Sequence, residues 1–172
     1  PPLPAGAEDG IRRGMYLVRP SPLAGRAKAG KAKKFPRVQL LGAGAILREA
    51  LSAAEILEQE YDIAADVWSV TSFTELRRDG LECEHWNGEH PAKPRRSWVE
   101  QCLAGGRGPV VAASDYVRAV PDLIRAWVPG RYLTLGTDGF GRSDTRAALR
   151  RFFGVDAQGI ARVAARAATG PG

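Results

Sequence analysis

The chain has 172 residues, of which 44% are hydrophobic and 26% are charged. These values suit one soluble domain with a sizeable core, and no apolar run reaches the ~18 residues that a membrane span requires. The net charge of +6 means that nucleic acid must be considered as a partner.

Most of the excess positive charge lies in one stretch, residues 26–37 (RAKAGKAKKFPR), which contains no acid. Its alternating Ala, Gly and Lys residues are typical of a solvated loop. Phe35 is its only aromatic residue, so a base-stacking platform is lacking. We therefore predict a flexible basic hairpin loop, poorly ordered over residues 26–34, and no nucleic-acid or membrane partner.

Apolar runs alternate with amphipathic stretches along the chain. The segments 37–44 and 63–72 are almost continuously apolar, as expected for strands that are covered on both faces of a parallel sheet. The segment 45–61 is the clearest helix, because its apolar residues recur at i, i+3 and i+4. The other expected strands are residues 14–18, 109–114 and 131–137, and the other expected helices are residues 73–86, 97–106, 115–128, 143–155 and 156–168.

Local signals place several helix ends. Ser72 followed by Glu75 has the spacing of a capping box, and Ser143 or Asp144 can cap the helix that follows. Pro121 must kink or start the helix expected there.

This order of elements predicts an α/β fold, a three-layer αβα arrangement around a mostly parallel, mixed sheet of about five strands. The strand at 14–18 is expected to be an antiparallel edge, because a loop and not a crossover helix follows it. Residues 1–13 are interpreted as a linker from a preceding domain, and residues 14–172 as the domain itself.

The turn LLGAG after the first apolar strand contains Gly42 and Gly44. The third glycine of a dinucleotide fingerprint is missing, and the acids about 20 residues on, Asp62 and Asp66, are poorly placed. The favoured interpretation is close packing of helix on strand. A nucleotide- or effector-binding regulatory domain stays open as the alternative, because the turn opens a helix whose N–H groups can take an anion.

A metal site is the next possibility, because Cys83, His85 and His90 lie close together in LECEHWNGEHP. Their spacing does not place them on one helix face, and the fourth ligand would have to be the distant Cys102. We therefore expect a helix end with a partly buried Trp86 and hydrogen-bonded histidines, and no metal. The two cysteines do not resemble a disulfide framework, so a reducing cytoplasm is expected.

Known catalytic signatures are absent from the sequence. There is no nucleophile elbow, no paired-histidine metal motif and no Walker loop. No catalytic or cofactor-binding residue is therefore assigned.

Three long stretches carry a family resemblance: VQLLGAGAILREALSAAEIL, ADVWSVTSFTELRRDGLECEHWN and LGTDGFGRSDTRAALRRFFGVD. They resemble the C-terminal domain of bacterial homodimeric pyruvate dehydrogenases, the decarboxylating component of the pyruvate dehydrogenase complex, and related domains occur in transketolases. The resemblance runs from about Gly10 to Ala168.

The resemblance implies a parent enzyme that uses thiamine diphosphate and magnesium to decarboxylate pyruvate and acetylate a lipoyl group. The cofactor would lie between two other domains, which supply the diphosphate-and-metal motif and the activating glutamate, so this chain alone should be inactive. It also implies three partners: the remaining domains of the parent chain, a homodimer partner and the dihydrolipoyl acetyltransferase component. In such enzymes this domain serves architecture and subunit contact.

The stretch TDGFGRSDTR, residues 137–146, has two interpretations. Its glycines and capping residues suffice for a well-formed corner. Alternatively, Arg142 and Phe140 reach out from the carboxyl edge of the sheet, where open α/β sheets place ligands, and the turn after the strand at 63–72 lies on the same edge. The residues of this candidate interface or effector site are Thr71, Ser72, Phe73, Glu75, Asp138, Gly139, Phe140, Gly141, Arg142 and Ser143.

Overall fold

The computed structural model describes residues 3–23, 35–106 and 108–170, so the loop predicted at 26–34 lies outside the described residues. Its strands are β1 (Met15–Arg19), β2 (Arg37–Ala43), β3 (Ala64–Val70), β4 (Val110–Ala113) and β5 (Tyr132–Leu135). Its helices are α1 (Glu8–Arg13), η1 (Gly44–Ile46), α3 (Leu47–Glu60), α4 (Phe73–Glu89), α5 (Trp98–Leu103), α6 (Ala119–Asp122), η2 (Arg125–Trp127), α7 (Arg146–Phe153) and α8 (Ala157–Thr169).

The five strands form one sheet in the order β1-β3-β2-β4-β5. Strand β1 pairs with β3 in antiparallel fashion, and all the other pairs are parallel. In the centre of the sheet, Leu40 lies opposite Val67 on one side and Val111 on the other. The predicted mixed sheet with an antiparallel first edge is confirmed.

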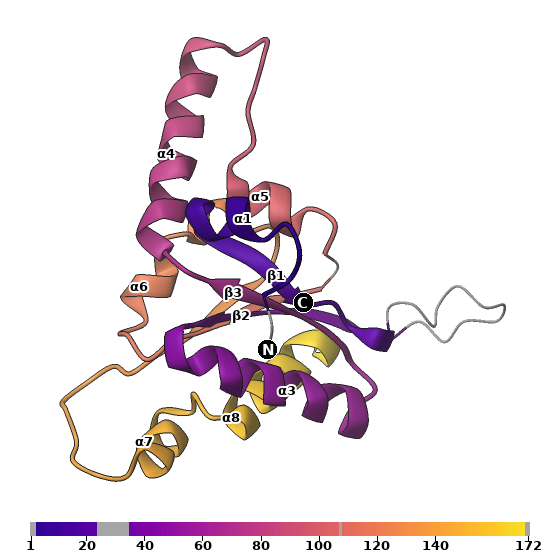
Figure 1. Ribbon diagram of the computed structural model, residues 1–172, viewed down its shortest axis with the longest axis vertical. Helices are drawn as coiled ribbons and strands as arrows, with labels where there is room; N and C mark the ends of the chain where they lie inside the picture. Colours follow the sequence, from indigo (N-terminus) through magenta and orange to yellow (C-terminus); the bar gives the residue numbers. More distant parts are fainter. Residues whose placement is uncertain (1–2, 24–34, 107, 171–172) are drawn as a thin grey trace, which may run out of the picture.

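Helices cover both faces of the sheet, which makes the predicted three layers (Figure 1). Because side chains alternate along a strand, Leu40 packs toward α3 and α8, whereas its neighbour Leu41 packs toward α4 and α5. Both side chains are fully buried. This two-sided burial explains why β2 reads as a continuous apolar run.

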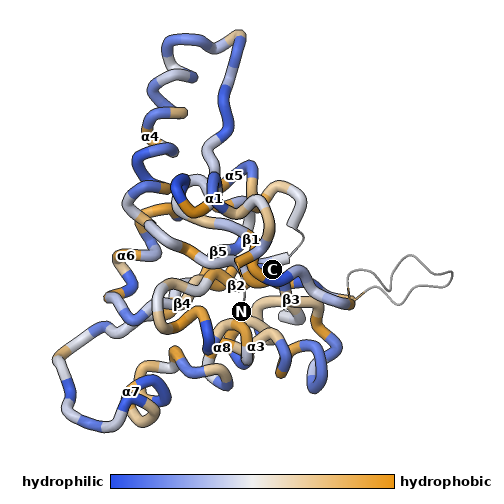
Figure 2. Tube along the Cα trace, viewed as in Figure 1, coloured by the Kyte–Doolittle hydropathy of each residue, from blue (hydrophilic) through white to orange (hydrophobic). Residues whose placement is uncertain are grey.

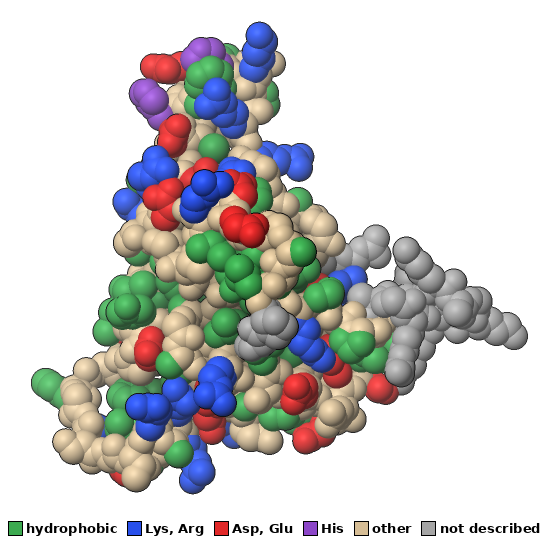
Figure 3. Space-filling view, viewed as in Figure 1, with side chains coloured by type: hydrophobic (Ala, Val, Ile, Leu, Met, Phe, Trp, Pro, Cys, Tyr) green, Lys and Arg blue, Asp and Glu red, His purple; other side chains and the backbone are tan. Residues whose placement is uncertain are grey.

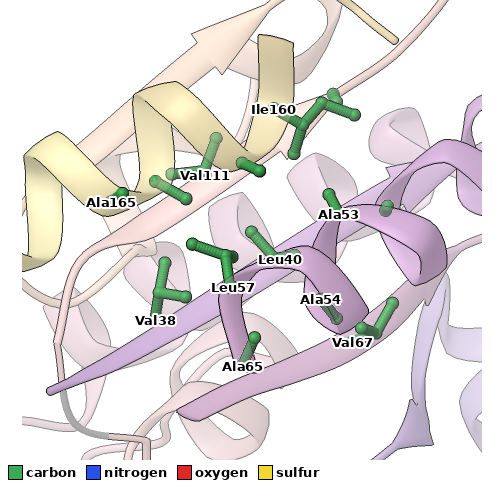
Figure 4. Packing of buried hydrophobic residues seen from close by; sticks show 14 of the residues in the cluster. Val38, Leu40, Ala53, Ala54, Leu57, Ala65, Val67, Val111, Ile160 and Ala165 are labelled. Carbon is green, nitrogen blue, oxygen red and sulfur yellow. The ribbon is translucent and has the colours of Figure 1, made fainter. Parts of the chain in front are cut away.

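Small residues let α3 and α8 lie close to the sheet and to each other. Ala53, Ala54 and Leu57 of α3 are fully buried, and they meet Ile160 and Ala165 of α8 above the strands (Figure 4). Arg150 also donates to Glu49 at 2.8 Å, which ties the end of α7 to α3.

Among the described helices, a side-chain cap marks the start of α4, α5, α7 and α8. Ser72 caps α4, since its hydroxyl accepts from the Glu75 N–H at 3.1 Å. The second half of the predicted capping box does not form: the Ser72 N–H donates to Gly14, and the Glu75 carboxylate binds Arg78 instead.

Replacing Ser72 with alanine should cost about 1 kcal/mol of unfolding free energy, because the first turn of α4 loses its side-chain acceptor. Urea unfolding followed by circular dichroism measures this. Ser143→Ala is the matched control, because Ser143 is exposed on the same edge of the sheet and no hydrogen bond of its hydroxyl is observed in the described residues. Equal stability of the two variants would contradict the capping role.

Two sequence expectations about helices are wrong. The stretch 115–128 is not one helix but contains the four-residue α6 and the three-residue η2, because Pro121 interrupts the ladder of helical hydrogen bonds. Helix α7 starts only at Arg146, and its cap is Thr145, whose hydroxyl accepts from the Ala148 N–H at 3.3 Å, rather than Ser143 or Asp144.

Two further segments contain more helix than expected. Helix α1 lies within residues 1–13, the stretch interpreted as a linker, and it contacts the domain: Thr71 donates to the Ile11 carbonyl at 2.8 Å. Helix α4 continues to Glu89 and projects from the body, and its far end and the segment that returns from it are mostly hydrophilic (Figure 2). None of the described helices is long and apolar enough to cross a membrane.

Candidate functional site: the carboxyl edge of the sheet

The two candidate segments, residues 71–75 and 137–146, lie at the same edge of the sheet, because β3 and β5 are parallel and both end there (Figure 1). Strands β2 and β4 separate them, which places the segments three strand intervals, or about 14 Å, apart. They form two neighbouring patches on one edge.

The first patch surrounds the N-terminal end of α4. Phe73 is buried in the core and not displayed on the surface, whereas Thr71 is exposed. Glu75 accepts two hydrogen bonds from Arg78, which lower the pKa of its carboxyl. Its charge is thus already engaged within the helix.

A cavity of about 430 Å³ opens beside this patch. It lies where β2 and β3 end and where the segment after β4 begins, and most of its lining is apolar. The volume is in the range of ligand-binding clefts. The lining residues are Ala43, Gly44, Val70, Thr71, Ser72, Phe73, Thr74, Tyr116 and Val120.

The second patch is a loop held firmly at its start. The Asp138 carboxylate accepts two hydrogen bonds from Arg118, one from the backbone N–H at 2.8 Å and one from the side-chain Nε at 2.5 Å. These hydrogen bonds lower the pKa of Asp138 and raise that of Arg118. Thr137 adds two further bonds, from its N–H to the Tyr116 carbonyl and from its hydroxyl to the Asp115 carbonyl.

Beyond Asp138 the loop extends away from the domain. Gly139 has a φ of +100°, which disfavours other residues there, and Phe140 is 97% exposed. The guanidinium of Arg142 lies 3.8 Å from the centroid of the Phe152 ring, a cation–π contact that holds the loop against α7. The loop is thus fixed at both ends with Phe140 at its apex.

Helix α7 itself is only partly covered. No residue in it is fully buried, and Phe152 is 57% exposed. A second cavity of about 400 Å³ lies beneath it, lined by Ile46, Leu149 and Phe153 among others. Eight residues are too few for a stable helix on their own, and contacts of Phe153 with the core and of Arg150 with Glu49 hold α7 on the domain.

The Phe140→Ala and Arg142→Ala variants should each have a free energy of unfolding within about 0.5 kcal/mol of the wild-type value, because both side chains are exposed. Thermal unfolding of the chain measures this. A loss of more than 1 kcal/mol for Phe140→Ala would contradict the exposed position of its ring.

Gly42, near the end of β2, serves packing, as predicted. A side chain at Gly42 would place its first carbon 2.7 Å from Leu47 Cα and 3.1 Å from Ala50 Cβ. The glycine therefore lets α3 approach the strand closely.

The residues considered as metal ligands, and not expected to bind a metal, lie apart from the sheet edge. His85 faces Glu89, while His90 bonds to the Trp86 carbonyl and stacks on the Trp86 ring at a centroid distance of 3.8 Å. The expected partly buried Trp86 and a hydrogen-bonded histidine are confirmed for Trp86 and His90, whereas His85 makes only the 3.4 Å contact with Glu89. Burial raises the pKa of the Cys102 thiol to about 12, and in the described part of the chain no three His, Cys, Asp or Glu residues are grouped to hold a metal ion.

Comparison with known proteins identifies the fold. The family model for the transketolase-like C-terminal domain matches residues 14–156. This chain belongs to that family. A transketolase from Leishmania mexicana superposes with a TM-score of 0.58 over 93% of this chain and 18% of its own, at 20% sequence identity.

The relatives more similar in sequence are longer proteins. The pyruvate dehydrogenase E1 component of Pseudomonas aeruginosa is 53% identical over 91% of this chain, and that of Escherichia coli K12 is 47% identical over 91%. This transketolase-like C-terminal domain spans 17% of the length of each. The similarity supports a domain of a larger enzyme subunit and not the alternative, a separate regulatory domain.

Proposed function

We propose that this chain is the C-terminal structural and subunit-contact domain of a thiamine diphosphate-dependent pyruvate dehydrogenase that decarboxylates pyruvate and acetylates lipoyl groups. The observation that carries the proposal is its identity of about 50% to pyruvate dehydrogenase E1 components, compared with 20% to a transketolase of the same fold. The same enzyme class suggests the remaining domains of the parent chain, a homodimer partner and a dihydrolipoyl acetyltransferase component as partners.

The described residues do not fit a thiamine diphosphate and magnesium site. A magnesium–diphosphate group needs clustered oxygen donors, but Glu75 is engaged with Arg78 and Asp138 with Arg118. No step of the reaction is therefore assigned to this chain. Its contribution is to present the carboxyl edge, with the Phe140 loop and α7, to neighbouring parts of the enzyme. The free thiols of Cys83 and Cys102 are in keeping with the reducing cytoplasm that we propose as its location.

The purified chain should neither bind thiamine diphosphate in the presence of magnesium nor release carbon dioxide from pyruvate. Isothermal titration calorimetry and a decarboxylation assay test this, with the longer protein that carries this sequence as the positive control. Stoichiometric cofactor binding by the chain alone would refute its assignment as a non-catalytic domain. Lack of pyruvate turnover by the longer protein would refute the parent activity.

A further inference from the structure

The apex of the loop after β5 displays one aromatic side chain. Phe140 is 97% exposed between two glycines, and no atom lies within 4 Å of a Cβ built at either glycine. The clamp between Asp138 and Arg118 and the stacking of Arg142 on Phe152 hold both sides of the apex. A large apolar side chain displayed on a loop that is held on both sides is available for insertion into another surface.

The same edge of the sheet carries a receptor of suitable character. The 430 Å³ cavity at the ends of β2 and β3 has an apolar lining that includes Ala43, Val70 and Val120. The chain's own Phe140 leaves it unfilled, since that ring is exposed. Hydrophobic side chains are present at several places on the face shown in the space-filling view (Figure 3). Tyr116, which lines the cavity, and the adjacent Val117 are 60% and 48% exposed.

Opposite charges accompany the two features. Arg142 follows Phe140 by two residues, and within the described ranges no carboxylate pairs with it. Asp115 is exposed next to this cavity, with its Oδ1 3.8 Å from the position of a Cβ on the lining residue Gly44, and it also lines the second cavity beneath α7. No ion pair of Asp115 is observed in the described structure. The projecting loop is therefore flanked by a positive charge and the cavity by a negative one.

From this complementarity we infer that the carboxyl edge pairs two copies of this chain about a two-fold axis. Phe140 of each copy enters the cavity of the other, and Arg142 of each copy meets Asp115 of the other. A two-fold interface requires a projection and a matching receptor on the same surface, and here both lie at one edge of the sheet. The inference rests on the proposed function and specifies which residues make the subunit contact.

Sedimentation equilibrium of the chain at low ionic strength tests the hydrophobic half of the contact. The wild type should dimerise, and Phe140→Ala should weaken the dimer about a hundredfold, tenfold for each of two symmetric contacts. Leu81→Ala is the control, because Leu81 is 41% exposed on α4, outside the cavity. A wild type that stays monomeric at about 200 µM would overturn the inference.

Charge reversal tests the reciprocal geometry. Arg142→Asp and Asp115→Arg should each weaken self-association at least tenfold, because each change places like charges together twice in the dimer. An equimolar mixture of the two variants should dimerise nearly as well as the wild type, because both contacts of the mixed dimer then join opposite charges. Circular dichroism verifies that both variants fold. A mixture that associates no better than its components would overturn the pairing.

These outcomes are separable from the fate of the proposed function. A monomeric chain whose longer parent protein still turns over pyruvate would refute the pairing alone. If the chain pairs as inferred but the longer parent protein does not turn over pyruvate, only the proposed function is refuted. The other domains of the parent protein could also cover the cavity. If the parent protein buries Phe140 whether or not two copies associate, the cavity is occupied by those domains, and the pairing is refuted.

Discussion

Replacing Gly108 with alanine should destabilise the chain by about 3 kcal/mol and lower its melting temperature by about 10 °C. Gly108 has a φ of +97°, and a Cβ there would lie 1.8 Å from the Arg37 carbonyl oxygen. The obstacle is backbone and not the end of a flexible side chain, so the strand must shift. The neighbouring Pro109 carbonyl accepts from the Gln39 N–H at 3.0 Å, so the shift disturbs the start of the β2–β4 pairing.

Gly105→Ala is the matched control for this variant. Gly105 lies three residues earlier in the same connection, has no atom within 4 Å of a Cβ built on it and has no unusual φ. Its replacement should change the unfolding free energy by less than about 0.5 kcal/mol. Differential scanning calorimetry of both variants measures the contrast, and similar melting temperatures would show that the connection at Gly108 can relax.

The layers of this fold were predictable because they depend on local patterns. The continuous apolar runs of β2 and β3 indicated strands that are covered on both faces. The spacing of Ala50, Ala54 and Leu57 indicated the helix between these strands. The first strand was placed at an edge by the nature of its connection alone. Each of these signals is contained within about 20 residues of sequence.

The features that shape the candidate site depend on contacts between distant residues. The clamp joins Asp138 to Arg118 across 20 positions, and no periodicity marks such a pair. The start of α7 at Arg146 follows from Thr145, one of several adjacent residues that could cap a helix. Phe73 is the first residue of α4, where the sequence allows its ring to be either exposed or buried, and only the packed structure shows that the ring is buried.

The opposite edge of the sheet contains a buried polar network that the sequence did not reveal. Asp66 is 7% exposed, and it accepts from the Ser21 N–H at 2.8 Å, from Arg37 at 2.6 Å and from Gln39 at 2.9 Å. Gln39 in turn accepts from the Trp68 indole at 2.7 Å. The buried Nε of Arg37 has no hydrogen-bond partner in the described residues, so Asp66 is the acceptor observed for this guanidinium.

Asp66→Ala should therefore cost about 3 kcal/mol of unfolding free energy, because it leaves three donors without their acceptor and a partly buried guanidinium without its counter-ion. Partial solvent access to Arg37, whose side chain is 29% exposed, keeps the loss below that of a fully buried pair. Urea denaturation measures it. Glu60→Ala, an exposed acid at the end of α3, is the control and should stay within about 0.5 kcal/mol.

A double-mutant cycle with Arg37→Ala separates the ion pair from the rest of the network. Removing both partners should cost less than the sum of the single losses, with a coupling of about 1–2 kcal/mol, because the unpaired charge that penalises Asp66→Ala is then absent. The bonds from Ser21 and Gln39 to Asp66 are lost in either background, so they cancel from the coupling. Strictly additive losses would mean that Arg37 is adequately solvated without Asp66, and that the cost of Asp66→Ala arises from those two donors instead.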